Sequence, residues 1–281
     1  MSAVALPSPA ASGDARQAPE RQGVTFGRVV RSEWTKLVSL RSTRWSLLAA
    51  VAMMILLAVG IAAVQMGRWN QLSLHDRLTY DSINTAVSGF NFSQLAVGVL
   101  GVLVITGEYS TGMIRSSLMA VPTRLPVLGA KALVFAVVTF ALMLVSAFIA
   151  FFVVQALVTQ HHLQHSLGDP HALRAVVGVA LFLTVLGLMA VGLGALLRNT
   201  AAGIAAFVFM LFVLPGVTAI LPASVADSVS PYLPLNAGTA VATSTFEDGH
   251  HLAPWAGFGL FCGYTAIILG AAAIGLVRRD A

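Results

Sequence analysis

Six long apolar segments constrain the fold of this chain more than any other feature. They cover roughly residues 45–66, 90–107, 126–158, 173–197, 201–221 and 254–277. Each is long enough for an α-helix to cross a hydrocarbon layer about 30 Å thick. The composition agrees, because 57% of the residues are hydrophobic and only 10% are charged, against about a quarter charged in soluble domains. The segments lack the two-residue alternation of barrel strands, so the sequence predicts an all-α membrane protein with six transmembrane helices.

The region before the first apolar segment divides into two parts. Residues 1–24 are rich in Ala, Ser, Pro and Gly, which predicts a disordered tail. They lack the pattern of a secretory signal peptide, and the first long apolar run begins only at Trp45. We therefore expect the first span to serve as its own insertion signal.

Residues 25–44 have the spacing of an amphipathic helix. One arc carries apolar side chains and the other carries basic and hydroxyl side chains, which predicts a helix lying in the membrane surface. Glu33 falls within the apolar arc, so we expect it to pair with a basic neighbour such as Arg41. The alternative is a solvated helix that leads into the first span. The apolar arc holds Phe26, Val29, Val30, Trp34, Leu37 and Leu40, and the opposite arc holds Arg28, Arg31, Ser32, Thr35, Lys36 and Ser39.

The basic residues predict the orientation. Thirteen of the sixteen Lys and Arg fall on the side of the N-terminus: seven before the first span, three between spans two and three, one after span four and two at the end. Only Arg68, Arg77 and Arg174 fall on the other side, together with all seven His. The positive-inside rule therefore places both termini in the cytoplasm of a cell-membrane protein. It also accounts for the net charge of +5 without a nucleic-acid surface.

The apolar segments offer little chemistry of their own. Glu108 and Lys131 stand only at the ends of spans two and three, which disfavours a proton-coupled transporter, while a sodium site built from backbone carbonyls stays open. No GxxxxGK[ST] motif is present, and the single Cys262 excludes a multi-cysteine metal site. The segment with His161, His162 and His165 lacks the Glu of HExxH, so a solvated polar loop is favoured over a metal site. We predict no catalytic residue, no metal and no cofactor on this chain.

The connection between spans two and three, residues 107–131, is more informative. It reads GEYSTGMIRSSLMAVPTRLPVLGAK. Residues 116–121 predict a short helix that ends before Pro122, lies along the inner surface and presents a knob to a soluble partner. Glu108 and Arg115, seven positions apart, share a helical face where each can hold an opposite charge on that partner or on the leader helix. An ordinary positive-inside loop would explain the basic residues but not the Glu-small-small-Gly pattern.

Two segments carry a resemblance to a known family. RSEWTKLVSLRSTRWSLL (31–48) and GVLVITGEYSTGMIRSSLMAVPTRLPVLGAKAL (101–133) resemble the actinobacterial permeases of ABC exporters, of the ABC-2 type. With the six spans the resemblance covers about residues 25–280. It implies an elbow helix before the first span and a coupling helix that docks into a separate ATP-binding subunit. It also implies two permease chains, as a homodimer or heterodimer, and short re-entrant helices between spans five and six.

The resemblance assigns these parts to residues of this chain. The elbow helix corresponds to 25–44, the coupling region to 108–126 and the outer cap to 222–253, which contains Pro231, Pro234 and Asn236. The elbow positions are Glu33, Trp34, Lys36 and Arg41, and the matching coupling positions are Glu108, Gly112, Arg115, Pro122, Arg124 and Lys131. Candidates for the pathway lining are Asn91, Ser93 and Gln94, with Gly98, Gly101 and Pro215 as hinges. Ordinary helix packing by small and weakly polar groups is the alternative for these six.

Three classes of function compete for this chain. The favoured one is the permease of an ATP-driven exporter of a hydrophobic or amphipathic compound, such as a drug, an antibiotic or a lipid-like molecule, with ATP and Mg²⁺ held by the partner subunit. The second is a membrane anchor or sensor subunit of a regulatory complex, for which a coupling loop would be superfluous. The third is a membrane enzyme, for which no acid, base or nucleophile converges inside the spans.

Overall fold

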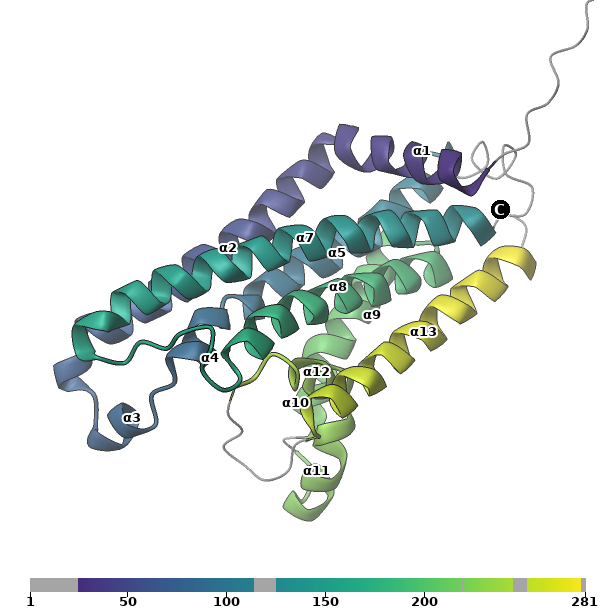
Figure 1. Cartoon of the computed structure of the whole chain (residues 1–281). Coiled ribbons are helices and arrows are strands. Elements are labelled where there is room, and N and C mark those ends of the chain that lie inside the picture. The colour runs from purple at the N-terminus through teal and green to yellow at the C-terminus, as the bar shows by residue number, and fades with distance from the viewer. Residues whose placement is uncertain (1–24, 114–124, 219, 245–251, 279–281) are drawn as a thin grey trace, which may run out of the picture.

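The computed structural model describes residues 25–113, 125–218, 220–244 and 252–278. All regular structure in these residues is helical, and six helices are long and apolar enough to cross a membrane (Figure 1). The predictions of an all-helical chain and of six candidate spans are confirmed. The six are Arg41–Gly67, Ser82–Ser110, Leu125–His161, Ala172–Leu197, Thr200–Thr218 and Pro254–Arg278.

The described residues form a series of helices. In chain order they are α1 (Phe26–Ser39), α2 (Arg41–Gly67), η1 (Trp69–Gln71), α3 (Leu74–Leu78), α4 (Ser82–Val87), α5 (Phe90–Ser110), α7 (Leu125–Val158), η2 (Thr159–His161), α8 (Ala172–Leu197), α9 (Thr200–Val208), η3 (Phe209–Val213), α10 (Leu214–Thr218), α11 (Ala223–Val229), η4 (Ser230–Tyr232), α12 (Pro234–Thr239) and α13 (Pro254–Arg278). We call the end of the bundle where α1 lies the α1 end.

Helix α8 is the centre of the bundle. It packs against α5, α7 and α13, and 78% of its most apolar window is buried, against 28% for α2 and 22% for α13. Small residues allow the close approach: a Cβ added at Gly101 of α5 would stand 2.5 Å from the carbonyl oxygen of Gly187 in α8. The outer helices keep their apolar side chains exposed, as helices that contact lipid require.

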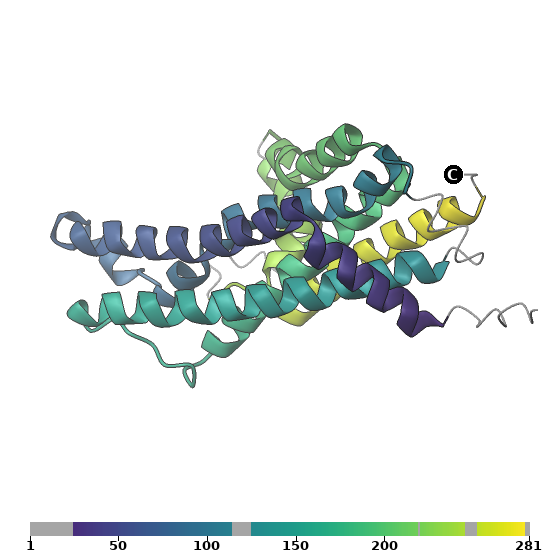
Figure 2. The same cartoon turned by 90° about the horizontal axis from the view of Figure 1, so that it is seen from above.

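The first helix separates from the first span at one residue. Leu40 is extended, with φ −73° and ψ 121°, between the end of α1 at Ser39 and the start of α2 at Arg41. The amphipathic helix is therefore shorter than the predicted 25–44, and α1 lies across the bundle end against α7 and α2 (Figure 2). Leu40 fits the apolar arc whether the helix continues or bends at this residue, so the hydrophobic pattern does not predict the bend.

The packed side of α1 is narrower than the apolar arc. Val29, Glu33 and Leu37, spaced four residues apart, are its buried residues. Phe26 and Trp34 belong to the predicted arc but are 50% and 49% exposed. These two rings are free to contact lipid, while the buried stripe fixes the helix to the bundle.

Span two begins earlier than predicted because α4 precedes α5. Asp81 caps α4, its Oδ1 accepting hydrogen bonds from the backbone N–H groups of Ile83 (2.8 Å) and Asn84 (3.0 Å). The Ser244 hydroxyl donates to the other carboxylate oxygen of Asp81, and the Ser244 N–H donates to Asn84 Oδ1 at 2.9 Å. Helices α4 and α5 meet at Gly89, where an added Cβ would lie 2.0 Å from the carbonyl oxygen of Met54 in α2.

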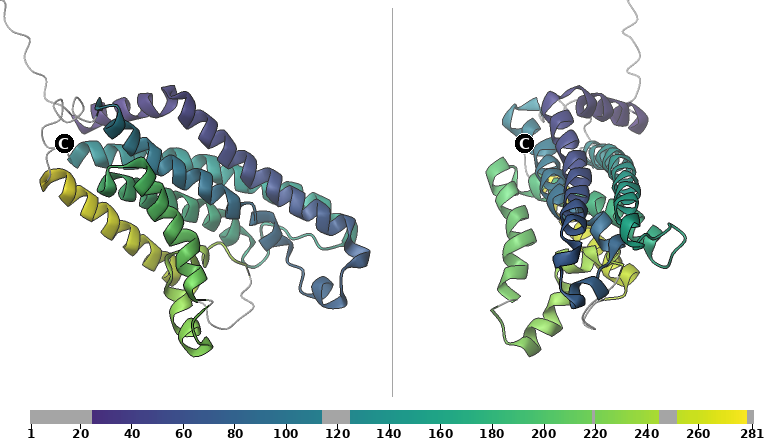
Figure 3. Two further views of the ribbon diagram at one scale, coloured as in Figure 1. Left: turned by 180° about the vertical axis from the view of Figure 1, so that it is seen from behind. Right: turned by 90° about the vertical axis from the view of Figure 1, so that its left-hand side faces the viewer.

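Span five is interrupted, and it lies at the edge of the bundle (Figure 3). The π-helical segment η3 stands between α9 and α10, next to Pro215, which has no backbone N–H to donate. Short helices α11 and α12 follow within the region predicted as a cap. Pro231 is the second residue of η4 and Pro234 is the first residue of α12. Asn236 Nδ2 donates to the Ser230 carbonyl oxygen at 2.9 Å.

Candidate functional site

Four ionisable side chains from three helices meet at the α1 end. Glu33 and Lys36 come from α1, Glu108 from the last turn of α5, and Lys131 from the second turn of α7. We call these four residues the ionic cluster. They include both charged residues that the sequence places at the facing ends of spans two and three.

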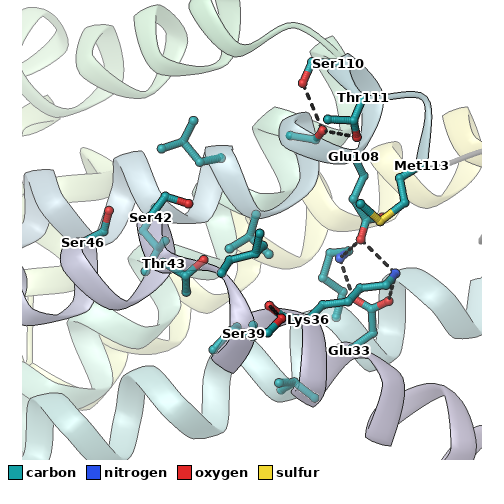
Figure 4. A pocket seen from close by; sticks show the side chains of 18 residues that line it. Glu33, Lys36, Ser39, Ser42, Thr43, Ser46, Glu108, Ser110, Thr111 and Met113 are labelled. Carbon is teal, nitrogen blue, oxygen red and sulfur yellow. Dashed lines mark hydrogen bonds and ion pairs between the residues drawn. The ribbon is translucent and has the colours of Figure 1, made fainter.

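Each lysine of the ionic cluster bridges both carboxylates, and Figure 4 labels Glu33, Lys36 and Glu108. Lys131 Nζ lies 2.5 Å from Glu33 Oε2 and 2.9 Å from Glu108 Oε1. Lys36 Nζ lies 2.7 Å from Glu33 Oε1 and 3.0 Å from Glu108 Oε1. The result is a closed ring of alternating charges with a formal sum of zero.

The ring is buried, which makes its pairing essential. The side chains of Glu33 and Lys131 are each 4% exposed and that of Glu108 is 8% exposed, while Lys36 keeps 25%. Burial alone lowers the pKa of Lys36, but its hydrogen bonds to Glu33 and Glu108 and their negative charges outweigh this effect, so the pKa is raised. A buried charge without its partner costs several kcal/mol, so the four residues stabilise the junction only together.

The geometry explains why Glu33 interrupts the apolar arc of α1. Glu33 pairs with basic side chains, as predicted, but they are Lys36 and Lys131 rather than Arg41, which is exposed at the start of α2. The contact of Glu108 with Lys36 agrees with the prediction of an opposite charge on the leader helix. Sequence reasoning named all four residues without joining them, since Glu33 and Lys131 are 98 positions apart.

The remaining predicted coupling residues lie beyond the cluster. Gly112, just past the end of α5, is exposed and has φ +70°, a conformation that glycine adopts without strain. Arg115, Pro122 and Arg124 lie outside the described residues, and so does the predicted helix at 116–121.

Arg198 makes further contacts between helices at the α1 end. The guanidinium of Arg198, at the end of α8, lies 5.5 Å from the ring centroid of Tyr109 on α5. Its Nη2 donates to the Gly275 carbonyl oxygen of α13 at 3.0 Å. Sequence reasoning used Arg198 only for orientation and missed this role, because a lone arginine after an apolar run indicates no partner.

The predicted lining residues of span two occupy different environments. Ser93 is fully buried and its hydroxyl donates to the Ala50 carbonyl oxygen of α2 at 2.8 Å, so it holds two helices together. Gln94 is also buried and donates to the Asn91 carbonyl oxygen at 2.9 Å, while Asn91 itself is exposed. These contacts are of the helix-packing kind, and the lining of a pathway stays a prediction.

The histidines after α7 turn to separate partners. The His161 ring stacks on Trp69, with 5.1 Å between centroids, and His165 Nδ1 lies 2.9 Å from the Ser82 hydroxyl. Within the described ranges, no three His, Cys, Asp or Glu side chains gather in a metal-binding arrangement.

The comparisons with protein-family models and with curated proteins find no relative of this chain. The likeness of residues 31–48 and 101–133 to exporter permeases therefore stays a prediction from the sequence.

Proposed function

We propose that this chain is the permease subunit of an ATP-driven exporter, of the ABC-2 type, and that a separate subunit binds and hydrolyses ATP. Two permease chains form the pathway, both termini are cytoplasmic, and the cargo is hydrophobic or amphipathic. The observation that carries the proposal is the ionic cluster, which joins α1 to both helices that flank residues 111–124.

The cluster supports a mechanical role for that connection. A subunit docked on residues 111–124 would push on the end of α5 and on the start of α7. Glu108 and Lys131, 2.9 Å apart, join these two helix ends, and Glu33 and Lys36 add α1 to the same unit. Since separating buried charges is costly, the three helices would move together, and ATP binding would shift the bundle between two arrangements.

The distribution of charge supports an external energy source. In the described residues, the six candidate spans carry no Asp, Glu, Lys or Arg outside their two terminal turns at either end. Ion-driven transporters place such groups near the middle of the membrane. In this chain the charged groups at the ends of spans two and three, Glu108 and Lys131, lie instead beside the segment on which a partner would dock.

The orientation rests on the basic residues. In the described ranges eight basic side chains lie at the α1 end and three at the opposite end, which favours a cytoplasmic α1 end. Those at the α1 end are Arg28, Arg31, Lys36, Arg41, Arg44, Lys131, Arg198 and Arg278, and those opposite are Arg68, Arg77 and Arg174.

The test is co-purification of the chain with an ATP-binding subunit encoded by a neighbouring reading frame. Arg115→Ala and Arg124→Ala are expected to weaken the complex and reduce its ATPase stimulation, whereas Arg68→Ala, at the opposite end, leaves both unchanged. Survival of both readouts after substitution across the whole 108–124 segment would show the coupling assignment to be wrong. A membrane anchor or sensor subunit would form the complex without ATP-dependent movement of any cargo.

A further inference from the structure

A pocket of about 370 Å³ lies beside the ionic cluster, where α1, α2, α5 and α7 meet (Figure 4). The volume is within the range of small-molecule sites. Its apolar lining includes Leu37 from α1, Leu100, Leu103 and Val104 from α5, and Val134 from α7. These side chains offer the pocket a surface suited to a hydrocarbon chain.

Hydroxyl groups line the pocket on α2 and α5. Ser42, Thr43 and Ser46 come from the first two turns of α2, and Figure 4 shows them across the pocket from Ser110 and Thr111. The hydroxyls of Ser110 and Thr111 already donate to the Gly107 carbonyl oxygen, at 3.0 and 2.9 Å. Ser42 is exposed and Ser46 is partly exposed, so these two hydroxyls are accessible to a ligand, while Thr43 is 3% exposed.

The charged residues of the lining cancel one another. They are the four members of the ionic cluster, two carboxylates and two ammonium groups, and both ammonium groups are bound to both carboxylates. An anion here would have to disturb that ring, whereas Glu108 Oε2, which is buried and makes no hydrogen bond within the described residues, can accept one from a hydroxyl head. An uncharged head that exchanges hydrogen bonds with hydroxyls has no such cost.

The position of the pocket suits a molecule held at a membrane boundary. The lining hydroxyls are on the first two turns of α2 and the last residues of α5, where two candidate spans end, and the apolar residues Leu100, Leu103 and Val104 lie further into span two. A ligand with its head at the helix ends and its chain along α5 would follow the polarity of the bilayer itself.

We infer that this pocket binds an amphiphile with an apolar chain and an uncharged head that bears hydroxyl or ester oxygens. The head contacts Ser42, Thr43 and Ser46, and the chain lies on Leu100, Leu103 and Val104. Two sources supply this chemistry: a neutral membrane lipid that stays bound, and an exported amphiphile on its way through.

Binding is tested on the purified full chain in lipid nanodiscs, without any ATPase subunit. The probe is a monoacylglycerol with a photoreactive group in its acyl chain, and the labelled residues are mapped by mass spectrometry. We expect labelling at residues 42–46 and 100–104, with competition by unlabelled monoacylglycerol. The same acyl chain with a phosphate head should label at least five-fold less, because the anion would disturb the ionic cluster, and with a trimethylammonium head, which neither donates nor accepts a hydrogen bond, roughly five-fold less, the effect of about one lost hydrogen bond.

Two variants separate the pocket from general lipid contact. Leu103→Trp fills the pocket and should abolish labelling, while Leu56→Trp, on a side chain of α2 that is 68% exposed, should not. The pair Ser42→Ala and Ser46→Ala adds no bulk and should weaken binding roughly five-fold per hydroxyl. Unchanged labelling of Leu103→Trp, or equal labelling by the charged probes, would overturn the inference.

A transport assay then distinguishes the two sources. Loss of labelling in Leu103→Trp with transport retained identifies a resident lipid. Loss of both, with the ATPase complex intact, identifies the exported amphiphile. Failure of the complex to form in the unmodified protein would contradict the proposed function and leave the binding result standing.

Discussion

Lys131 Nζ lies 2.5 Å from Glu33 Oε2, an ion pair between residues 98 positions apart in the chain. It attaches the amphipathic helix α1 to α7 through a contact that is 4% exposed on each side. The attachment therefore does not depend on the buried Val29 and Leu37 of α1 alone, since separating the ion pair would leave two buried charges without partners.

Removing one member of the ionic cluster should destabilise the fold. In Lys131→Met two buried carboxylates share a single ammonium, and we expect a loss of about 3–5 kcal/mol in the free energy of unfolding. Arg44→Met, on an exposed side chain of α2, should change it by less than about 0.5 kcal/mol. Unfolding of both variants in detergent measures the difference, and equal stability of the two would contradict the buried network.

Removing an opposite pair should cost less than the two single changes together. Glu108→Leu with Lys131→Met leaves Glu33 and Lys36, 2.7 Å apart, as a neutral pair. A double-mutant cycle should then give a coupling energy of roughly 0.5–3 kcal/mol. Strict additivity would mean that the two side chains do not interact in the folded protein.

The raised pKa of Lys36 predicts the pH above which the folded protein loses stability. A group whose pKa is higher in the folded protein contributes stability that is complete below its ordinary value of 10.5 and is lost as the pH rises through the folded value. Lys36 should therefore contribute equally from pH 6 to pH 9, and unfolding midpoints should fall above about pH 10.5.

Lys36→Met is the control for this pH dependence. It removes the titrating ammonium, so the alkaline decrease should be smaller in the variant than in the unmodified protein. A decrease of the same size in both would assign the loss to other groups.

Gly89 should not tolerate a side chain. An added Cβ would stand 2.0 Å from the Met54 carbonyl oxygen, so Gly89→Ala must push α5 away from α2, at a cost of about 1–3 kcal/mol. Gly60→Ala is the matched control, because nothing lies within 4 Å of the added atom and alanine favours the helix by up to about 1 kcal/mol. Equal stability of both variants would show that the helices separate there without cost.

The sequence predicts the spans well because each needs only a continuous apolar run. Their ends are less predictable. Span two starts at Ser82, since Asp81 caps α4 and Ser82 is buried against Gln155 and His165, contacts 73 and 83 positions away. No local pattern contains such contacts.

The candidate site was likewise only partly predictable from the sequence. A glutamate in an apolar arc and two charges at facing span ends each indicate an unusual position. Their assembly depends on the bend at Leu40, because α1 could not cross α7 if it continued straight into α2. Leu40 fits both a continuous helix and a bend, so its identity does not predict the bend.

The long sequence separation within the ionic cluster also orders events during synthesis. Glu33 cannot meet Lys131 until 98 further residues have been made, a delay of about 5–20 s at about 5–20 residues per second. The two partners of α1 in the ionic cluster, Glu108 and Lys131, follow 72 residues after Lys36 and 98 residues after Glu33. Helix α1 therefore reaches its final place only after the third span has entered the membrane, which makes the beginning of the chain one of the later parts of its bundle to be fixed.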